Sequence, residues 1–127
     1  MSNLTDLFER PRVAALLAAY AARHCSPLAV VDAVFKRISA VDRPEVWTRL
    51  LPEDAVRVQA RALEDALAEE GDAVFGRLPL FGVPFAVKDN VDVAGLPTTA
   101  ACEPFSYTPD VSAFAVQRLL DAGAILI

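Results

Sequence analysis

Proline and glycine divide this chain into two parts that cannot share one kind of secondary structure. Segment 78–84 contains two prolines and one glycine. A helix is excluded there because proline lacks the backbone N–H and clashes with the preceding turn. The residues before this segment instead repeat apolar side chains at helical spacing. The pattern predicts a mainly helical part over residues 1–76, followed by strands and turns over residues 77–127.

Three helices are predicted in the first part. The first begins after Pro11. The second begins at Ser26, a good N-cap that is followed by proline, and ends near Asp42, two residues before the next proline. The third opens after Pro52 and runs to Gly71. Each has an apolar stripe, made of Val13, Leu16, Leu17 and Tyr20 in the first, Val31, Val34, Phe35, Ile38 and Val41 in the second, and Val56, Ala60, Leu63 and Leu67 in the third.

The second part has the pattern of a crossover between two parallel strands. Segment 85–88 is predicted to be a short buried strand, and segment 91–99 a turn-rich loop. A helix then ends at Gly123, and segment 124–127 begins another apolar strand. Parallel strands need such a long connection. The expected fold class is therefore α/β, with helices packed on a mixed, partly parallel sheet.

Three further features of the chain complete the predicted organisation. Segment 46–50 alternates apolar and polar residues and is predicted to be a short strand. Either Asp110 or Ser112 is expected to cap the last helix. An apolar strand with no turn or polar tail after it is an aggregation liability. We therefore expect that the natural fold continues beyond Ile127, or that the chain is a truncated form.

Composition restricts the class of protein. The chain has 127 residues and a net charge of −5, which argues against a nucleic-acid-binding protein because such proteins usually carry a basic face. Segment 1–6 lacks the basic and apolar regions of a secretory signal. The longest apolar stretch, 13–22, is about half a membrane span. The expectation is a soluble, cytoplasmic protein without a membrane or nucleic-acid partner.

The cysteines and the histidine do not have the spacing of a metal site. Cys25 and Cys102 lie far apart, and His24 is the only histidine. Zinc sites need clusters of such ligands, so no metal is expected. In a reducing compartment the two cysteines are expected to stay free thiols.

Lys88 is conspicuous because it follows the apolar run Phe-Ala-Val, and the chain has only one other lysine, Lys36. Burial of an ammonium is costly, and a buried lysine escapes that cost by becoming neutral. A neutral lysine can accept a proton from a hydroxyl. The residues alone leave a second interpretation open, in which Lys88 lies at a strand end and reaches water or pairs with Asp89.

Three segments resemble the amidase-signature family in the expected order. Segment 82–90, Gly-Val-Pro-Phe-Ala-Val-Lys-Asp-Asn, is similar to the family's catalytic-lysine segment. Segment 95–99, Gly-Leu-Pro-Thr-Thr, is similar to its Gly-x-Pro-Thr-Thr loop, and Asp-Ala-Gly-Ala-Ile at 121–125 to its helix end before the next strand. Within the family the allophanate hydrolase group is most similar, through segment 85–102 and the Pro-Glu-Val-Trp of 44–47.

The resemblance implies a fold, a reaction and one catalytic residue. Residues 1–127 would be the N-terminal part of an amidase domain, with 1–76 as a helical lead-in and 77–127 as the start of the catalytic α/β core. The family uses a Ser–cis-Ser–Lys triad to hydrolyse amides, without a metal or an organic cofactor. Lys88 would be the triad lysine, acting on a small allophanate-like amide, and a homodimer is one possible assembly.

The family's two catalytic serines are not found in this chain. It has five serines, none of them in a Gly-Ser-Ser context: Ser2, Ser26, Ser39, Ser106 and Ser112. Three alternatives therefore stay open. The chain is the N-terminal part of an allophanate hydrolase, part of another amidase-signature enzyme such as a general amidase or the amidase component of an amidotransferase, or a catalytically inactive fragment that acts only in binding or assembly.

Overall fold

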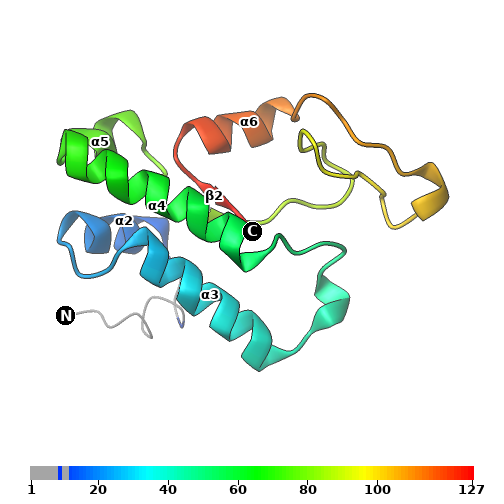
Figure 1. Ribbon diagram of the computed structural model, residues 1–127, viewed down its shortest axis with the longest axis horizontal. Coiled ribbons are helices and arrows are strands. Elements are labelled where there is room, and N and C mark those ends of the chain that lie inside the picture. Colours follow the sequence, from blue (N-terminus) through cyan, green and yellow to red (C-terminus); the bar gives the residue numbers. More distant parts are fainter. Residues whose placement is uncertain (1–8, 10–11) are drawn as a thin grey trace.

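The computed structural model describes residue 9 and residues 12–127 of the chain. Pro11 and segment 1–6, which entered the sequence predictions, lie outside the described residues. In chain order the elements are α2 (Val13–Ala21), α3 (Pro27–Val41), the 3₁₀ turn η1 (Pro44–Val46), α4 (Glu53–Glu70), α5 (Ala73–Arg77), β1 (Pro84–Phe85), the 3₁₀ turn η2 (Glu103–Phe105), α6 (Phe114–Asp121) and β2 (Ile125–Leu126) (Figure 1).

The helix boundaries follow the sequence signals closely. Ser26 is the N-cap of α3, and its hydroxyl oxygen accepts the N–H of Ala29 at 3.3 Å. The same helix ends at Asp42 in the left-handed conformation, with φ of 48°. Helix α4 ends at Gly71. The three predicted helices of the first part are therefore confirmed.

The apolar stripes of α3 and α4 form the main core. The two helices lie side by side in Figure 1, and β2 packs against α4. Their shared cluster consists of Val31, Phe35, Val56, Ala60, Ile125 and Ile127. A second cluster joins α2, α3 and α5 through Tyr20, Val30, Val74, Leu78 and Phe81. Burial of each such side chain stabilises the fold by about 1.5–3 kcal/mol relative to exposure.

Strands β1 and β2 pair in parallel, as the crossover pattern predicts. Pro84 lies opposite Ile125 and Phe85 opposite Leu126. The connection between the strands contains α6, which ends before Gly123 at a φ of 89°. The prediction of an α/β fold with a partly parallel sheet is therefore confirmed. The described part of the chain is mainly helical, with a small sheet.

Three local predictions were wrong or incomplete. Segment 46–50 is not a strand, because Pro44 starts the tight turn η1. The predicted strand 85–88 is shorter and begins one residue earlier. Its last ladder bond joins the N–H of Ile127 to the carbonyl of Phe85 at 3.0 Å, so Lys88 lies past the pairing. The short helix α5 was not predicted.

The predicted cap of α6 was also wrong. Its N-cap is Ala113, which makes no side-chain cap bond. The Ser112 hydroxyl instead accepts the N–H of Ala94 at 2.9 Å, so it holds the preceding loop rather than the helix. None of the helices within the described residues is long and apolar enough to cross a membrane.

Candidate active site

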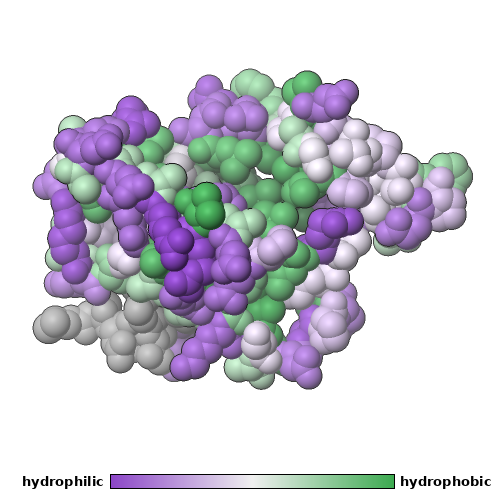
Figure 2. All heavy atoms as spheres, viewed as in Figure 1, coloured by the Kyte–Doolittle hydropathy of each residue, from purple (hydrophilic) through white to green (hydrophobic). Residues whose placement is uncertain are grey.

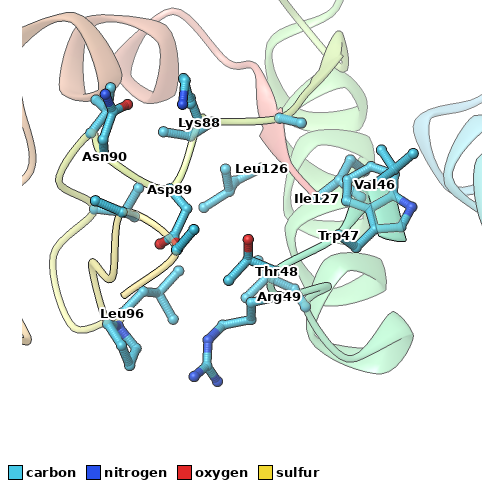
Figure 3. Close-up of a pocket in the computed structure, with 18 residues that line it drawn as sticks. Val46, Trp47, Thr48, Arg49, Lys88, Asp89, Asn90, Leu96, Leu126 and Ile127 are labelled. Atoms are coloured by element: carbon cyan, nitrogen blue, oxygen red, sulfur yellow. The ribbon is translucent and has the colours of Figure 1, made fainter. Parts of the chain in front are cut away.

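A cavity of about 650 Å³ opens between the end of the small sheet and two loops. It is lined by three segments: residues of 46–51 from the end of η1 onward, residues of 86–101 after β1, and the two last residues of the chain. The molecular face in Figure 2 is hollowed beside apolar side chains, and Figure 3 shows how the lining residues surround the space. This cavity is the place where the chain brings its predicted catalytic residue together with neighbouring polar groups.

Lys88 lines this cavity. It lies three residues beyond the end of β1 and is exposed, so the predicted burial of its stem in a strand is not observed. Within residues 12–127 no carboxylate lies within ion-pair distance of its amine. Lys88 therefore borders the cavity without an ion-pair partner from this part of the chain.

Asp89, the next residue, points the other way (Figure 3). Its carboxylate accepts the N–H of Thr99 at 3.1 Å and also the Thr99 hydroxyl. The Thr99 hydroxyl is the main reason why the pKa of Asp89 lies below its ordinary value, with the Thr99 N–H as the next cause. The alternative pairing of Lys88 with Asp89 is therefore not found, and Asp89 holds the following loop, as its side-chain chemistry predicts.

The loop that Asp89 holds has a strained backbone. Ala100 and Ala101 have φ of 49° and 60°, a conformation that costs residues with a Cβ roughly 1–2 kcal/mol each. Hydrogen bonds hold both residues in place. The Ala100 N–H donates to the Asp89 carbonyl at 2.8 Å, and the Ala101 N–H donates to the Thr99 hydroxyl at 3.2 Å. Both alanines line the cavity, so the strained loop forms part of its wall.

A second aspartate holds the same loop farther from the cavity. Asp92 accepts the hydroxyl of Thr98 at 2.9 Å and that of Tyr107 at 2.6 Å. The hydrogen bond to Asp92 is the main cause that raises the pKa of Tyr107. Thr98 and Tyr107 also form an isolated antiparallel bridge. The loop after Lys88 is thus built around two adjacent, buried threonines, each bound to its own aspartate.

Sequence reasoning did not find this pair of aspartate–threonine contacts. The available signal was the occurrence of two aspartates shortly before two consecutive threonines in a turn-rich segment, since such side chains often bind nearby backbone. The prediction of a strand over 46–50 also gave no sign that Arg49 lines the cavity. Trp47 packs against the main core and lines the cavity as well.

No metal-binding cluster is evident in the described part of the chain. Among residues 9 and 12–127 no group of three or more histidine, cysteine, aspartate or glutamate side chains is arranged to hold an ion. Cys25 and Cys102 are both free and partly buried. The polar lining residues of the cavity include Lys88, Arg49 and Asp89, whose carboxylate is bound by a threonine, and much of the remaining lining is apolar. This arrangement suits proton transfer to or from a bound substrate or a neighbouring hydroxyl.

Known proteins share both the sequence and the fold of this chain. The family model described as Amidase matches residues 29–127. The urea amidolyase of Saccharomyces cerevisiae is 40% identical over 92 residues, which are 72% of this chain and 5% of that protein. The urea amidolyase of Lachancea kluyveri is 43% identical over 89 residues, which are 70% of this chain and 4% of that protein. A glutamyl-tRNA(Gln) amidotransferase component of a Geobacillus species is 39% identical over 99 residues, which are 77% of this chain and 20% of that protein.

A solved structure agrees with these matches. The allophanate hydrolase of Kluyveromyces lactis superimposes with a TM-score of 0.63 at 28% sequence identity, covering 99% of this chain and 18% of that one. The chain thus spans about a fifth or less of the length of each of these four proteins. The family model covers the second and third predicted helices, the Lys88 loop and both strands, and the chain therefore belongs to the amidase family.

Proposed function

We propose that this chain is the N-terminal part of an amide hydrolase of the allophanate hydrolase type, with Lys88 as its catalytic base. The observation that carries the proposal is the state of Lys88. Lys88 lines a cavity, no carboxylate in the described part of the chain pairs with its amine, and the adjacent carboxylate of Asp89 is bound to Thr99 instead. The Gly-Val-Pro-Phe-Ala-Val-Lys-Asp-Asn segment that carries Lys88 lies within the part of the chain that the Amidase family model matches, which supports the same assignment.

The proposed reaction is acyl transfer from an amide to a serine and then to water. Lys88 accepts a proton from a bridging serine, which in turn takes the proton of the nucleophilic serine. The nucleophile attacks the amide carbonyl, and the leaving nitrogen departs with a proton returned through the same groups. Backbone N–H groups stabilise the oxyanion. Both serines lie outside this chain in our proposal, and no metal or organic cofactor takes part.

The proposal assigns separate tasks to the two parts of the chain. Residues 1–76 form a helical lead-in, and residues 77–127 begin the catalytic α/β core with β1, the Lys88 loop and β2. We propose that the enzyme acts in the cytoplasm, and the free thiols of Cys25 and Cys102 are consistent with the reducing conditions there. The substrate is a small linear amide, and allophanate is favoured by the likeness to allophanate hydrolase and urea amidolyase.

A second candidate is the amidase component of an amidotransferase, which would pass an amide nitrogen to an acceptor. The Geobacillus relative of that kind is 39% identical, almost the same identity as that of the yeast urea amidolyase. Both candidates use the same proposed lysine, so Lys88 does not separate them. Their substrates do separate them.

The deciding experiment measures ammonia release by the complete enzyme from allophanate, acetamide and glutamine. Our proposal expects the highest kcat/KM with allophanate and no need for a partner protein. A preference for glutamine would support the amidotransferase candidate instead. No turnover of any of the three amides would contradict the proposed activity altogether.

A further inference from the structure

Asp89 is bound to its loop at three points. Its two carboxylate oxygens accept the N–H and the hydroxyl of Thr99, and its own carbonyl accepts the N–H of Ala100 at 2.8 Å. The carbonyl of Lys88 accepts the N–H of Val91 at 2.9 Å, which closes a turn around the same aspartate. The backbone on both sides of the Lys88–Asp89 peptide is therefore fixed.

The direction of the Lys88 side chain depends on this attachment. Lys88 is not held by the sheet, because β1 ends at Phe85. Its amine has no ion-pair partner in the described residues either. Lys88 opens the turn that its own carbonyl closes with Val91, so the contacts that fix Asp89 in this turn also fix the direction in which the Lys88 side chain leaves the backbone. Figure 3 shows the two side chains pointing apart.

We infer that Asp89 is a positioning residue for the proposed reaction: by binding Thr99 it sets the place of the Lys88 amine and of the cavity wall at Ala100 and Ala101. The inference rests on the proposed function of Lys88. Asp89 itself touches neither the substrate nor the reacting atoms in this account. Its carboxylate is already occupied by Thr99, so it is not available as a second base.

The strained alanines explain why a carboxylate is needed at this position. Ala100 and Ala101 hold left-handed conformations that residues with a Cβ leave when nothing holds them. The Thr99 hydroxyl donates to Asp89 and accepts from Ala101, so one threonine links the aspartate to the strained turn. Asparagine at position 89 keeps only one acceptor oxygen and would release one of these links.

Asp92 provides a matched control within the same loop. It binds Thr98 and Tyr107 by side-chain contacts of the same kind, but it does not line the cavity. Asp92→Asn therefore weakens the loop without changing the contact of Asp89 with Thr99 beside Lys88. If Asp89 only stabilised the loop, Asp89→Asn and Asp92→Asn would lower kcat by the same factor.

The test compares Asp89→Asn, Thr99→Val, Thr99→Ser and Asp92→Asn in the complete enzyme, with kcat expressed per folded molecule. A displacement of the base by about 1 Å is expected to cost roughly 100-fold in rate. We expect Asp89→Asn and Thr99→Val to lower kcat by about that factor with little change in KM, and the double variant to be no worse than either single one. Thr99→Ser, which keeps the hydroxyl, should restore most of the rate. Hydrogen exchange over residues 96–102 should rise in Asp89→Asn.

Three results would overturn the inference. These are a wild-type kcat for Asp89→Asn, an equal loss for Asp92→Asn, or a Thr99→Ser variant as slow as Thr99→Val. Lys88→Ala, measured in parallel, shows whether only the positioning role of Asp89 is wrong or the proposed function as well. If Lys88→Ala is inactive while Asp89→Asn is fully active, only the positioning role is wrong. If Lys88→Ala keeps its activity, the proposed function is wrong and the positioning role falls with it.

Discussion

The side chain of Gln59 binds the main chain of Leu126 as a neighbouring strand would. Its Nε2 donates to the Leu126 carbonyl and its Oε1 accepts the Leu126 N–H, each at 3.2 Å. The N–H and the carbonyl of Leu126 are thereby hydrogen-bonded on the edge of β2 that faces α4, while β1 pairs with the other edge. Just after the strand, the carbonyl of Ile127 accepts the N–H of Leu51 at 2.8 Å.

Gln59→Ala is predicted to destabilise the chain. The change leaves the N–H and the carbonyl of a half-buried residue without their partners, which costs about 1–3 kcal/mol. Gln117→Ala is the matched control, because Gln117 makes an exposed hydrogen bond to Asp121 at 2.8 Å. Urea denaturation should show a clear loss of unfolding free energy for Gln59→Ala and almost none for the control. Equal effects would show that Gln59 does not support β2.

Gly82→Ala is predicted to be more damaging. Gly82 has φ of 68°, and an added Cβ would lie 2.9 Å from the ring of Tyr20, whose hydroxyl donates to the Gly82 carbonyl at 2.8 Å. Backbone strain and overpacking together should cost about 2–4 kcal/mol. Gly76→Ala is the control, since nothing lies within 4 Å of its Cβ position and it belongs to α5. That control should raise stability by about 0.5–1 kcal/mol. A tolerated Gly82→Ala would refute the close contact with Tyr20.

The Asp89–Thr99 contact predicts a specific dependence of stability on pH. The pKa of Asp89 is lowered from its ordinary value of 3.8 by the Thr99 hydroxyl and N–H. The folded state therefore binds the proton less readily than the unfolded state. The contact stabilises the fold above pH 3.8, and this contribution is lost as the pH falls further. The difference in unfolding free energy between wild type and Asp89→Asn should be full at neutral pH and shrink in acid. Thr99→Val should weaken the same dependence, and a difference that stays constant down to about pH 2 contradicts the assignment.

The 127-residue chain alone is predicted not to release ammonia from allophanate or simple amides. It supplies a base but neither of the family's serines, and the members of such triads act as a unit. The comparison is with the complete enzyme under the same conditions. Turnover by the short chain at a comparable rate, abolished by replacing one of its five serines, would show that the nucleophile is present after all.

Much of the fold could be predicted because its signals are local. The cap at Ser26, the stop at Asp42 and the glycine at position 123 act through their own backbone conformations, and all three lie where the sequence places them. The strand predicted at 46–50 was wrong because alternation alone does not supply a pairing partner. Strand 85–88 was too long for the same reason, since pairing depends on how far β2 runs alongside it.

The site was predicted only in part. The motif singles out Lys88, and the structure places this residue in the lining of the cavity, while its catalytic role stays a prediction. The contacts of Asp89 with Thr99 and of Asp92 with Thr98 link residues about ten positions or fewer apart, but a specific loop conformation is needed to bring them together. Periodicity carries no information on such a loop, because its hydrogen bonds run from side chains to turns and not along a helix or strand.

Replacement of Lys88 in the complete enzyme tests the central claim most directly. Lys88→Ala should lower kcat for amide hydrolysis by orders of magnitude while the melting temperature stays close to that of wild type, because the side chain is exposed. Lys88→Arg should fail as well, since arginine cannot give up its proton. Lys36→Ala is the matched control, as Lys36 is the other lysine of the chain and lies exposed on α3. Loss of turnover in both Lys88 variants with full activity of the control is the predicted result, and a Lys88→Ala enzyme that still turns over amides at the wild-type rate would contradict the account.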